Sequence, residues 1–312
     1  MNRREFGKRF ALGAIGLRMR EAMTSPHAFG PQIALTMDDF AWRNAIKLSA
    51  QERNEAILAT LNKQHMRAAL FVVGRNVEDL QGKELLKAWN DAGHLIGNHT
   101  YSHRNYNDPA LTAKFFAEDI LRAESLLKGF PQFRKYFRFP MLKEGNTVQK
   151  RDALRRFLER QEYRAGSVTI DNSDWIVDQR LRARLQREPN AELSPYRNFY
   201  LQHMWERAQY YESLARSVLR RPVKHTLLTH FNLLNALFLD DLVEMFKSKG
   251  WQWINADEAL LDAVFTRRPR IVPAGESIIW GLAKESGRIS QHLRYPAEDG
   301  EYETAKMDAL GL

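Results

Sequence analysis

From residue 31 onward, short apolar or β-branched runs alternate with longer segments in which apolar residues recur at the spacing of a helix. The short runs predict strands at 33–37, 68–73, 94–97, 136–139, 165–170, 225–229 and 251–254. The longer segments predict helices near 50–64, 79–92, 110–128, 147–162, 236–249 and 256–264. This alternation predicts a parallel sheet, and about seven strands predict an α/β fold closed as a distorted (β/α) barrel.

Two parts of the chain break this rhythm. Residues 178–222 are rich in Arg, Gln and Glu and mostly helical in pattern, which predicts a helical insertion before the sixth strand. After Thr266, prolines and glycines interrupt the periodicity, so residues 266–312 are expected to form an extended tail over the domain. The sequence therefore predicts one domain over residues 31–265 and a C-terminal extension.

The first 30 residues differ from the rest of the chain. Residues 2–8 read Asn-Arg-Arg-Glu-Phe-Gly-Lys and precede a small, apolar stretch over 10–17, an order that resembles a twin-arginine export signal. The apolar stretch is short, because charge returns at Arg18 and Arg20. A functional signal would place the protein in the periplasm or outside the cell. The alternative is a basic N-terminal arm on a cytoplasmic protein.

Composition narrows the classes of site and partner. The chain has 312 residues and no cysteine, which excludes disulfides, thiolate metal sites and cysteine nucleophiles. Its net charge of +9 includes a basic stretch at 150–187, where Arg and Lys alternate with Glu and apolar residues. That pattern is typical of solvated helix faces, so no nucleic-acid partner is expected. No apolar run approaches the ~20 residues of a transmembrane helix.

Ionisable residues follow the predicted strands. Asp38 and Asp39 come directly after the first strand, and His99 and His103 follow the third. Barrel enzymes hold their catalytic groups at such strand ends, although an Asp pair can also cap a helix. If residues 99–103 turn helically, both imidazoles can meet one ion. Two histidines and a carboxylate leave coordination positions open, as a hydrolytic metal requires. Zinc is the default, and iron, cobalt, nickel or manganese would also suit these ligands.

Three further segments place polar side chains after later strands. Arg138 lies at the end of the fourth strand, Asp174 and Trp175 follow the fifth, and His230 follows the sixth. Each could be structural when taken alone, as a surface ion pair, a helix cap, a core indole or a buried histidine. Together with the two earlier segments, they give five strand ends with ionisable groups.

In this order, the five segments resemble the motifs of the polysaccharide deacetylase family, also called the NodB homology domain or carbohydrate esterase family four. The resemblance covers about residues 31–265 and implies a distorted (β/α) barrel, a divalent metal and hydrolysis of N-acetyl groups on amino sugars. It also implies individual roles: Asp38 as general base, Asp39, His99 and His103 as metal ligands, His230 as general acid, Arg138 and Asp174 as their positioning partners, and Trp175 as a wall of the site.

Some positions depart from the family pattern. Phe40 stands where glycine is usual after the Asp pair, Met141 follows Pro140 where an aromatic residue is common, and Phe231 follows the histidine where Asp is frequent. These departures predict a groove that is narrower, more apolar or shaped for another N-acyl compound, and so bear on the substrate rather than on the reaction.

The expected function is metal-dependent deacetylation of an N-acetylated polysaccharide or oligosaccharide. One alternative keeps the metal site and hydrolyses a small non-sugar amide. Another is a carbohydrate-binding module without catalysis, although all of the implied ligands and proton-transfer groups are present. A fourth interpretation is nucleic-acid binding through the basic helices, which would need no metal.

Overall fold

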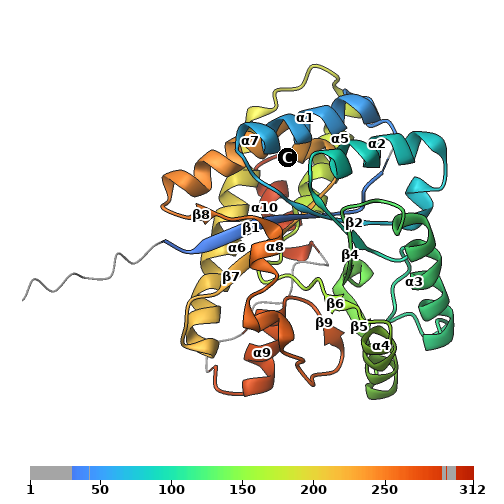
Figure 1. Ribbon diagram of the computed structural model, residues 1–312. Helices are drawn as coiled ribbons and strands as arrows, with labels where there is room; N and C mark the ends of the chain where they lie inside the picture. The colour runs from blue at the N-terminus through green and yellow to red at the C-terminus, as the bar shows by residue number, and fades with distance from the viewer. Residues whose placement is uncertain (1–29, 42, 290–292, 294–299) are drawn as a thin grey trace, which may run out of the picture.

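The computed structural model describes residues 30–41, 43–289, 293 and 300–312. The expected export signal, with Arg3 and Arg4, lies outside the described residues. A seven-stranded sheet forms the centre of the protein (Figure 1), and all of its strand pairs are parallel. Its strands are β1 (Gln32–Asp38), β2 (Ala69–Val72), β3 (Leu95–Asn98), β4 (Phe133–Phe137), β6 (Arg164–Ala165), β7 (Lys224–His230) and β8 (Gln252–Trp253).

The strand order is β6-β4-β3-β2-β1-β7, and β8 pairs with the start of β1. The predicted strand 165–170 is shorter than expected, because its backbone changes partners along its length. Gly166 donates to the carbonyl of Phe137, the last residue of β4, whereas Ile170 donates to the Thr226 carbonyl on β7. This exchange brings the two sheet edges together at a single bridge between Ile170 and Leu227. The predicted parallel α/β fold, curled into a distorted barrel, is confirmed.

Helices follow the strands as the apolar spacing predicts. They are α1 (Ala50–Lys63), α2 (Leu80–Asp91), α3 (Ala113–Leu127), α4 (Val148–Arg160), α7 (Leu233–Ser248) and α8 (Ala256–Ala259). Ser49 and Glu52 form a capping box that fixes the start of α1. The helix predicted at 256–264 is wrong in length: Asp262 accepts from the Val264 amide and starts a separate 3₁₀ turn over Ala263–Thr266.

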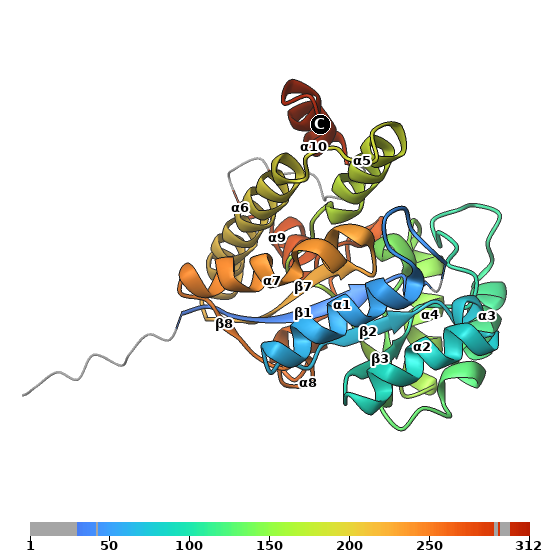
Figure 2. The same ribbon diagram turned by 90° about the horizontal axis from the view of Figure 1, so that it is seen from above.

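The insertion is helical, as predicted, but it begins earlier. It consists of α5 (Asp174–Arg187) and α6 (Ser194–Leu219), which pack against each other and against α7. Figure 2 shows α5 and α6 together with the last helix, α10 (Glu301–Ala309), on one side of the molecule. In the described parts of the chain, no helix combines the length and the apolar character required to span a membrane.

The predicted extended tail is wrong. Residues 274–275 form β9 (Ala274–Gly275), which pairs antiparallel with β5 (Lys143–Gly145). Ser277 then caps α9 (Ile278–Ser286), whose residues 278–283 are all buried, and α9 packs against α6. The apolar run from Ile278 to Ala283 forms a core helix because it is too apolar to stay in solvent. The prolines and glycines around it obscured this signal.

Candidate active site and metal centre

Parallel pairing brings the site residues to one edge of the sheet. β1 and β7 pair in a register that sets Asp38 opposite His230. His99 follows the last residue of β3, and Arg138 follows the last residue of β4. Side chains from strands that are distant in sequence therefore meet at the carboxyl ends of the strands, where barrel sites form.

Asp39, His99 and His103 converge on a common point. Their ligand atoms all lie within 4.8 Å of one another. Asp39 Oδ1 lies 2.9 Å from His103 Nε2 and 3.5 Å from His99 Nε2. The helical turn expected over residues 99–103 is absent; instead Thr100 and His103 have positive φ angles of 63° and 54°. These left-handed residues fold the segment back and bring the second imidazole to the first.

The donor set fits a divalent transition metal. His99 Nδ1 lies 2.9 Å from the Arg138 carbonyl oxygen, which can only accept, so Nε2 keeps its lone pair toward Asp39. Burial lowers the pKa of His99, which keeps the imidazole neutral as coordination requires. Asp39 Oδ1 is buried but accepts no well-formed hydrogen bond. Although burial alone would raise the pKa of Asp39, His103 and the other nearby imidazoles lower it, so the carboxylate stays ionised.

A buried arginine holds Asp38. Arg138 Nη1 donates to Asp38 Oδ1 at 2.6 Å, and its Nε donates to the Gly166 carbonyl at 2.6 Å. The guanidinium lies 3.9 Å from the centre of the Phe71 ring. A side chain at Gly97 or Gly166 would collide with that ring, so two glycines make room for the platform on which Arg138 rests. Asp38 is thereby oriented toward the cavity, with Oδ2 3.6 Å from His99 Nε2.

A second paired group also lines the cavity. His230 Nδ1 lies 2.6 Å from Asp174 Oδ1, and Asp174 Oδ2 accepts from the His230 amide at 2.9 Å. Asn235 also donates to Asp174, at 2.8 Å, and sequence reasoning missed this contact. Burial opposes a charge on His230, but the Asp174 carboxylate raises its pKa to about 10. The imidazole is therefore a protonated donor at neutral pH.

These groups surround one cavity of about 380 Å³. Asp38, Asp39, His99, His103, Trp175 and His230 line it, while Arg138 and Asp174 lie behind Asp38 and His230. The lining also contains Met141, one of the departures from the family pattern, together with Asn105, Leu142 and Lys143. Met141 and Leu142 reach it through positive φ angles of 53° and 55°, which apolar residues rarely adopt.

The expected narrowing of the groove by Phe40 and Phe231 is wrong. Both rings are buried, and their centroids lie 4.9 Å apart. Neither residue lines the cavity. Only Met141, of the three departures from the family pattern, faces the site. Phe40 and Phe231 therefore replace polar or small residues with core packing beneath the site, not with a barrier inside it.

Comparison with known proteins gives one family match. Residues 28–157 match the family described as polysaccharide deacetylase. A peptidoglycan-N-acetylglucosamine deacetylase from Bacillus cereus is 26% identical over 145 residues, which make up 46% of this chain and 46% of that protein. The chain thus aligns with about half the length of this curated relative.

Two solved structures share the fold. A CE4 family pseudoenzyme from Bacillus anthracis superposes with a TM-score of 0.50 at 20% identity, covering 75% of this chain and 66% of that one. A mutant of that protein with restored enzymatic activity gives a TM-score of 0.50 at 22% identity, over 75% and 69% of the two chains. At this level of identity, the likeness supports the fold alone.

Proposed function

We propose, starting from the match of residues 28–157 to the polysaccharide deacetylase family, that the chain is a metal-dependent hydrolase that removes acetyl groups from N-acetylated amino sugars. One observation carries the proposal. A carboxylate fixed by an arginine, Asp38, and a protonated imidazole fixed by a carboxylate, His230, face the same cavity as Asp39, His99 and His103. Amide hydrolysis needs such a base and such an acid on either side of the scissile bond.

In the proposed reaction, Asp38 takes a proton from the attacking water, and the bond from Arg138 holds its carboxylate in position. His230 gives its proton to the departing amine nitrogen, and Asp174 stabilises the imidazolium beforehand. Water and an N-acetyl group are thereby converted to acetate and a free amine. A divalent ion held by Asp39, His99 and His103 would polarise the amide carbonyl and make the water more acidic.

The donor set supports zinc as the first candidate for this ion. One carboxylate and two imidazoles leave coordination positions open to water and substrate, as in catalytic zinc sites. Cobalt and other divalent transition metals accept the same donors. Imidazole and carboxylate ligands do not discriminate strongly among these metals. Zinc is therefore the ion to test first.

Acetate release from N-acetylglucosamine oligomers tests the function. Purified protein is assayed as prepared, after chelation, and after addition of zinc or cobalt. We expect chelation to abolish release and the added metal to restore it. A chain that binds metal stoichiometrically through His99 but releases no acetate would favour an amidase acting on a non-sugar amide. Saccharide binding without hydrolysis would indicate a binding module, a relevant outcome because a CE4 family pseudoenzyme shares the fold.

A further inference from the structure

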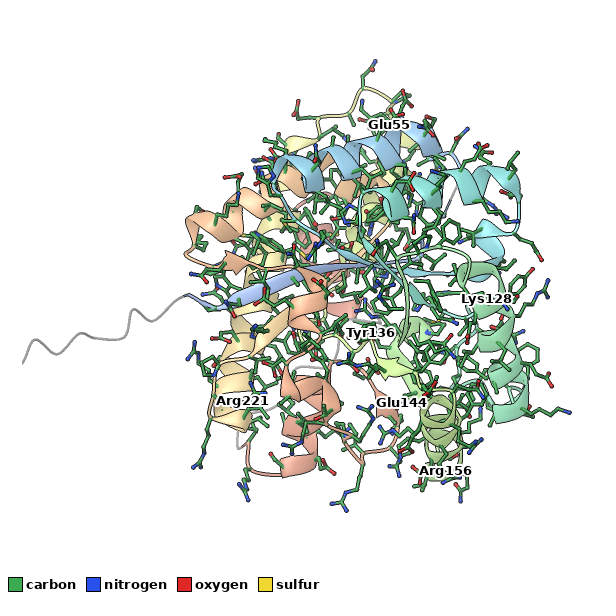
Figure 3. The ribbon with its side chains drawn as sticks, viewed as in Figure 1. Glu55, Lys128, Tyr136, Glu144, Arg156 and Arg221 are labelled. Carbon is green, nitrogen blue, oxygen red and sulfur yellow. The ribbon has the colours of Figure 1, made fainter. Side chains whose placement is uncertain are left out.

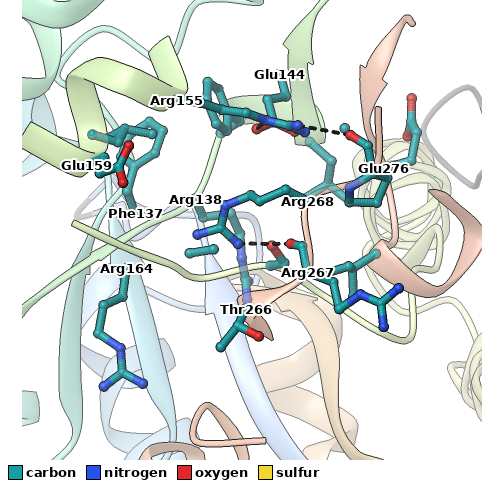
Figure 4. Close-up of a pocket in the computed structure, with 18 residues that line it drawn as sticks. Phe137, Arg138, Glu144, Arg155, Glu159, Arg164, Thr266, Arg267, Arg268 and Glu276 are labelled. Atoms are coloured by element: carbon teal, nitrogen blue, oxygen red, sulfur yellow. Dashed lines mark hydrogen bonds and ion pairs between the residues drawn. The ribbon is translucent and has the colours of Figure 1, made fainter. Parts of the chain in front are cut away.

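A second cavity lies behind the proposed catalytic base. It has a volume of about 390 Å³ and lies between α4, the chain that follows β4 and β6, and the C-terminal segment 266–278 (Figure 4). Its walls are partly apolar, with Phe137, Phe139 and Leu158 among them. One wall comes from the C-terminal segment, which lies beyond the part of the chain that matches the family.

One shared residue and two ion pairs lie in the partition between the two cavities. Leu142 lines both cavities. Arg138 lines the second cavity, while its partner Asp38 lines the metal cavity. In the same way, Glu276 lines the second cavity, and its partner Lys143, at 2.6 Å, lines the metal cavity. Leu142 and these two ion pairs therefore lie between the two cavities.

The second cavity has an excess of positive charge. Five arginines and three glutamates line it. Glu144 accepts two hydrogen bonds from Arg155, at 2.7 and 2.8 Å, in a bidentate ion pair. Glu276 forms an ion pair with Lys143. Arg164, Arg267 and Arg268 have no carboxylate within 4.0 Å in the described parts of the chain. Arg138 also lines this cavity, and its buried Nη2 atom has no hydrogen-bond partner.

Arg268 has the most suitable position among these cations. Its Nη1 donates to the carbonyl oxygens of Phe265 and Arg267, at 3.0 and 2.9 Å. Those bonds fix the guanidinium plane and leave its other N–H groups available. In Figure 4 the Arg268 side chain reaches toward the middle of the cavity, whereas Arg164 and Arg267 extend toward its margin. A planar, fixed guanidinium matches the two oxygens of a carboxylate.

We propose that this cavity is a second ligand site, which binds a small organic carboxylate through Arg268 and accepts its apolar part against Phe137, Phe139 and Leu158. Acetate belongs to this class. If the proposed function holds, acetate is also the product formed on the other side of the partition, so the site would hold product next to Arg138 and Asp38. The carboxylate class rests on the cavity alone, whereas the link to the product rests on the proposed function.

Binding of ¹³C-labelled acetate, followed by NMR titration of the full chain, tests the assignment. Chelated wild type and His99→Ala isolate the second cavity, because neither can hold acetate on a metal. We expect saturable binding to both, and about tenfold weaker binding to Arg268→Gln, the loss typical of one charge-assisted interaction. Arg268→Lys, which keeps the charge but not the fork, should fall between them. Acetamide, the neutral isostere, should not compete.

Arg156→Gln is the matched control. Arg156 lies on α4 beside Arg155 but projects from the periphery of the protein, as Figure 3 shows, and it does not line the cavity. This variant removes the same charge and should bind acetate as wild type does. Equal affinity in Arg268→Gln and wild type, competition by acetamide, or no saturable binding to the chelated protein would overturn the assignment. Binding that depends on Arg268 in a chain without deacetylase activity would contradict only the proposed function.

Discussion

Asp38 and Asp39 are adjacent in the chain, yet their carboxylates meet different partners. Asp38 ends β1 and pairs with Arg138, whereas Asp39 has a positive φ of 60° and turns its carboxylate to His103. A strand directs successive side chains to opposite faces, so both carboxylates can enter one cavity only if the backbone turns between them. The left-handed conformation of Asp39 provides that turn, and Asp tolerates it better than most residues.

The Asp174–His230 pair predicts a shift in the pH dependence of activity. Burial lowers the pKa of His230, and Asp174 contributes most to raising it to about 10, so in Asp174→Asn only the weaker attraction of Asp39 and Asp38 opposes burial and the pKa falls. A general acid is active below its pKa, so the basic limb of the kcat/KM profile should move to lower pH. The variant should retain more activity at pH 6 than at pH 8.

Deacetylation rates measured from pH 5 to 10 on both proteins check this prediction. Asp241→Asn, which removes a carboxylate from the surface pair with Arg197, serves as the control and should leave the profile unchanged. A basic limb at the same pH in Asp174→Asn and wild type would show that His230 is not the proton donor.

For single residues, sequence reasoning placed a side chain in the cavity correctly where that position follows from a strand end. Asp38, Asp39, His99 and His230 all reach the cavity for that reason. It missed Leu142, which, like Met141, enters the site through a positive φ angle at an apolar position. Nothing in the residue types Met and Leu indicates such a backbone.

At the scale of elements, α10 supports the turn that begins α5. Ser173 is the N-cap of α5, but its hydroxyl makes no capping bond and donates instead to Glu303 Oε2, at 3.0 Å. The Ser173 amide donates to His203 Nε2 on α6, at 3.1 Å. Glu303 is 1% exposed. The turn that carries Asp174 is therefore fastened by the insertion and by the C-terminal helix.

This arrangement predicts that Glu303→Gln lowers kcat about tenfold with little change in KM. The amide weakens the bond that holds Ser173, so the Asp174–His230 pair loses its fixed position while the substrate groove remains. Glu301→Gln, an exposed change on the same helix, is the matched control. Steady-state kinetics on both variants test this prediction. Equal kcat values for Glu303→Gln and Glu301→Gln would mean that α10 does not position the Asp174–His230 pair.

The elements themselves were predictable to different degrees. Long amphipathic helices such as α1 and α3 were identified within a few residues, because their apolar spacing and caps agree. The segment 165–170 was not, because its exchange of partners from β4 to β7 depends on the closure of the sheet. The helix α9 was hidden by neighbouring prolines and glycines, although Ser277 and the apolar run after it are a helix-start signal.

At the scale of the whole molecule, the site combines residues from the segment that matches the family with residues from the segment that follows it. The family match ends at residue 157, within α4, whereas Asp174, Trp175 and His230 lie beyond it. The C-terminal segment is also part of the main core: Ile278, Ile279 and Leu282 belong to the same buried cluster as β1. The residues after 266 therefore stabilise the domain that carries the site.

This integration predicts a large cost for Ile279→Ala. Ile279 is fully buried, so its truncation should lower the free energy of unfolding by about 2–5 kcal/mol. Leu261→Ala is the matched control: Leu261 is 67% exposed, and its change should cost little. Urea denaturation followed by circular dichroism measures both. A cost for Ile279→Ala no larger than that of the control would show that α9 is not part of the folded core.

The central claim is that the strand-end cavity performs metal-assisted N-deacetylation. Bound zinc and acetate release are measured together in wild type, Asp38→Asn and His99→Ala, with N-acetylglucosamine oligomers as the substrate. The account predicts that Asp38→Asn keeps its zinc and loses activity by about 10²-fold or more, whereas His99→Ala loses both. Full activity in Asp38→Asn, or activity in His99→Ala without bound metal, would contradict it.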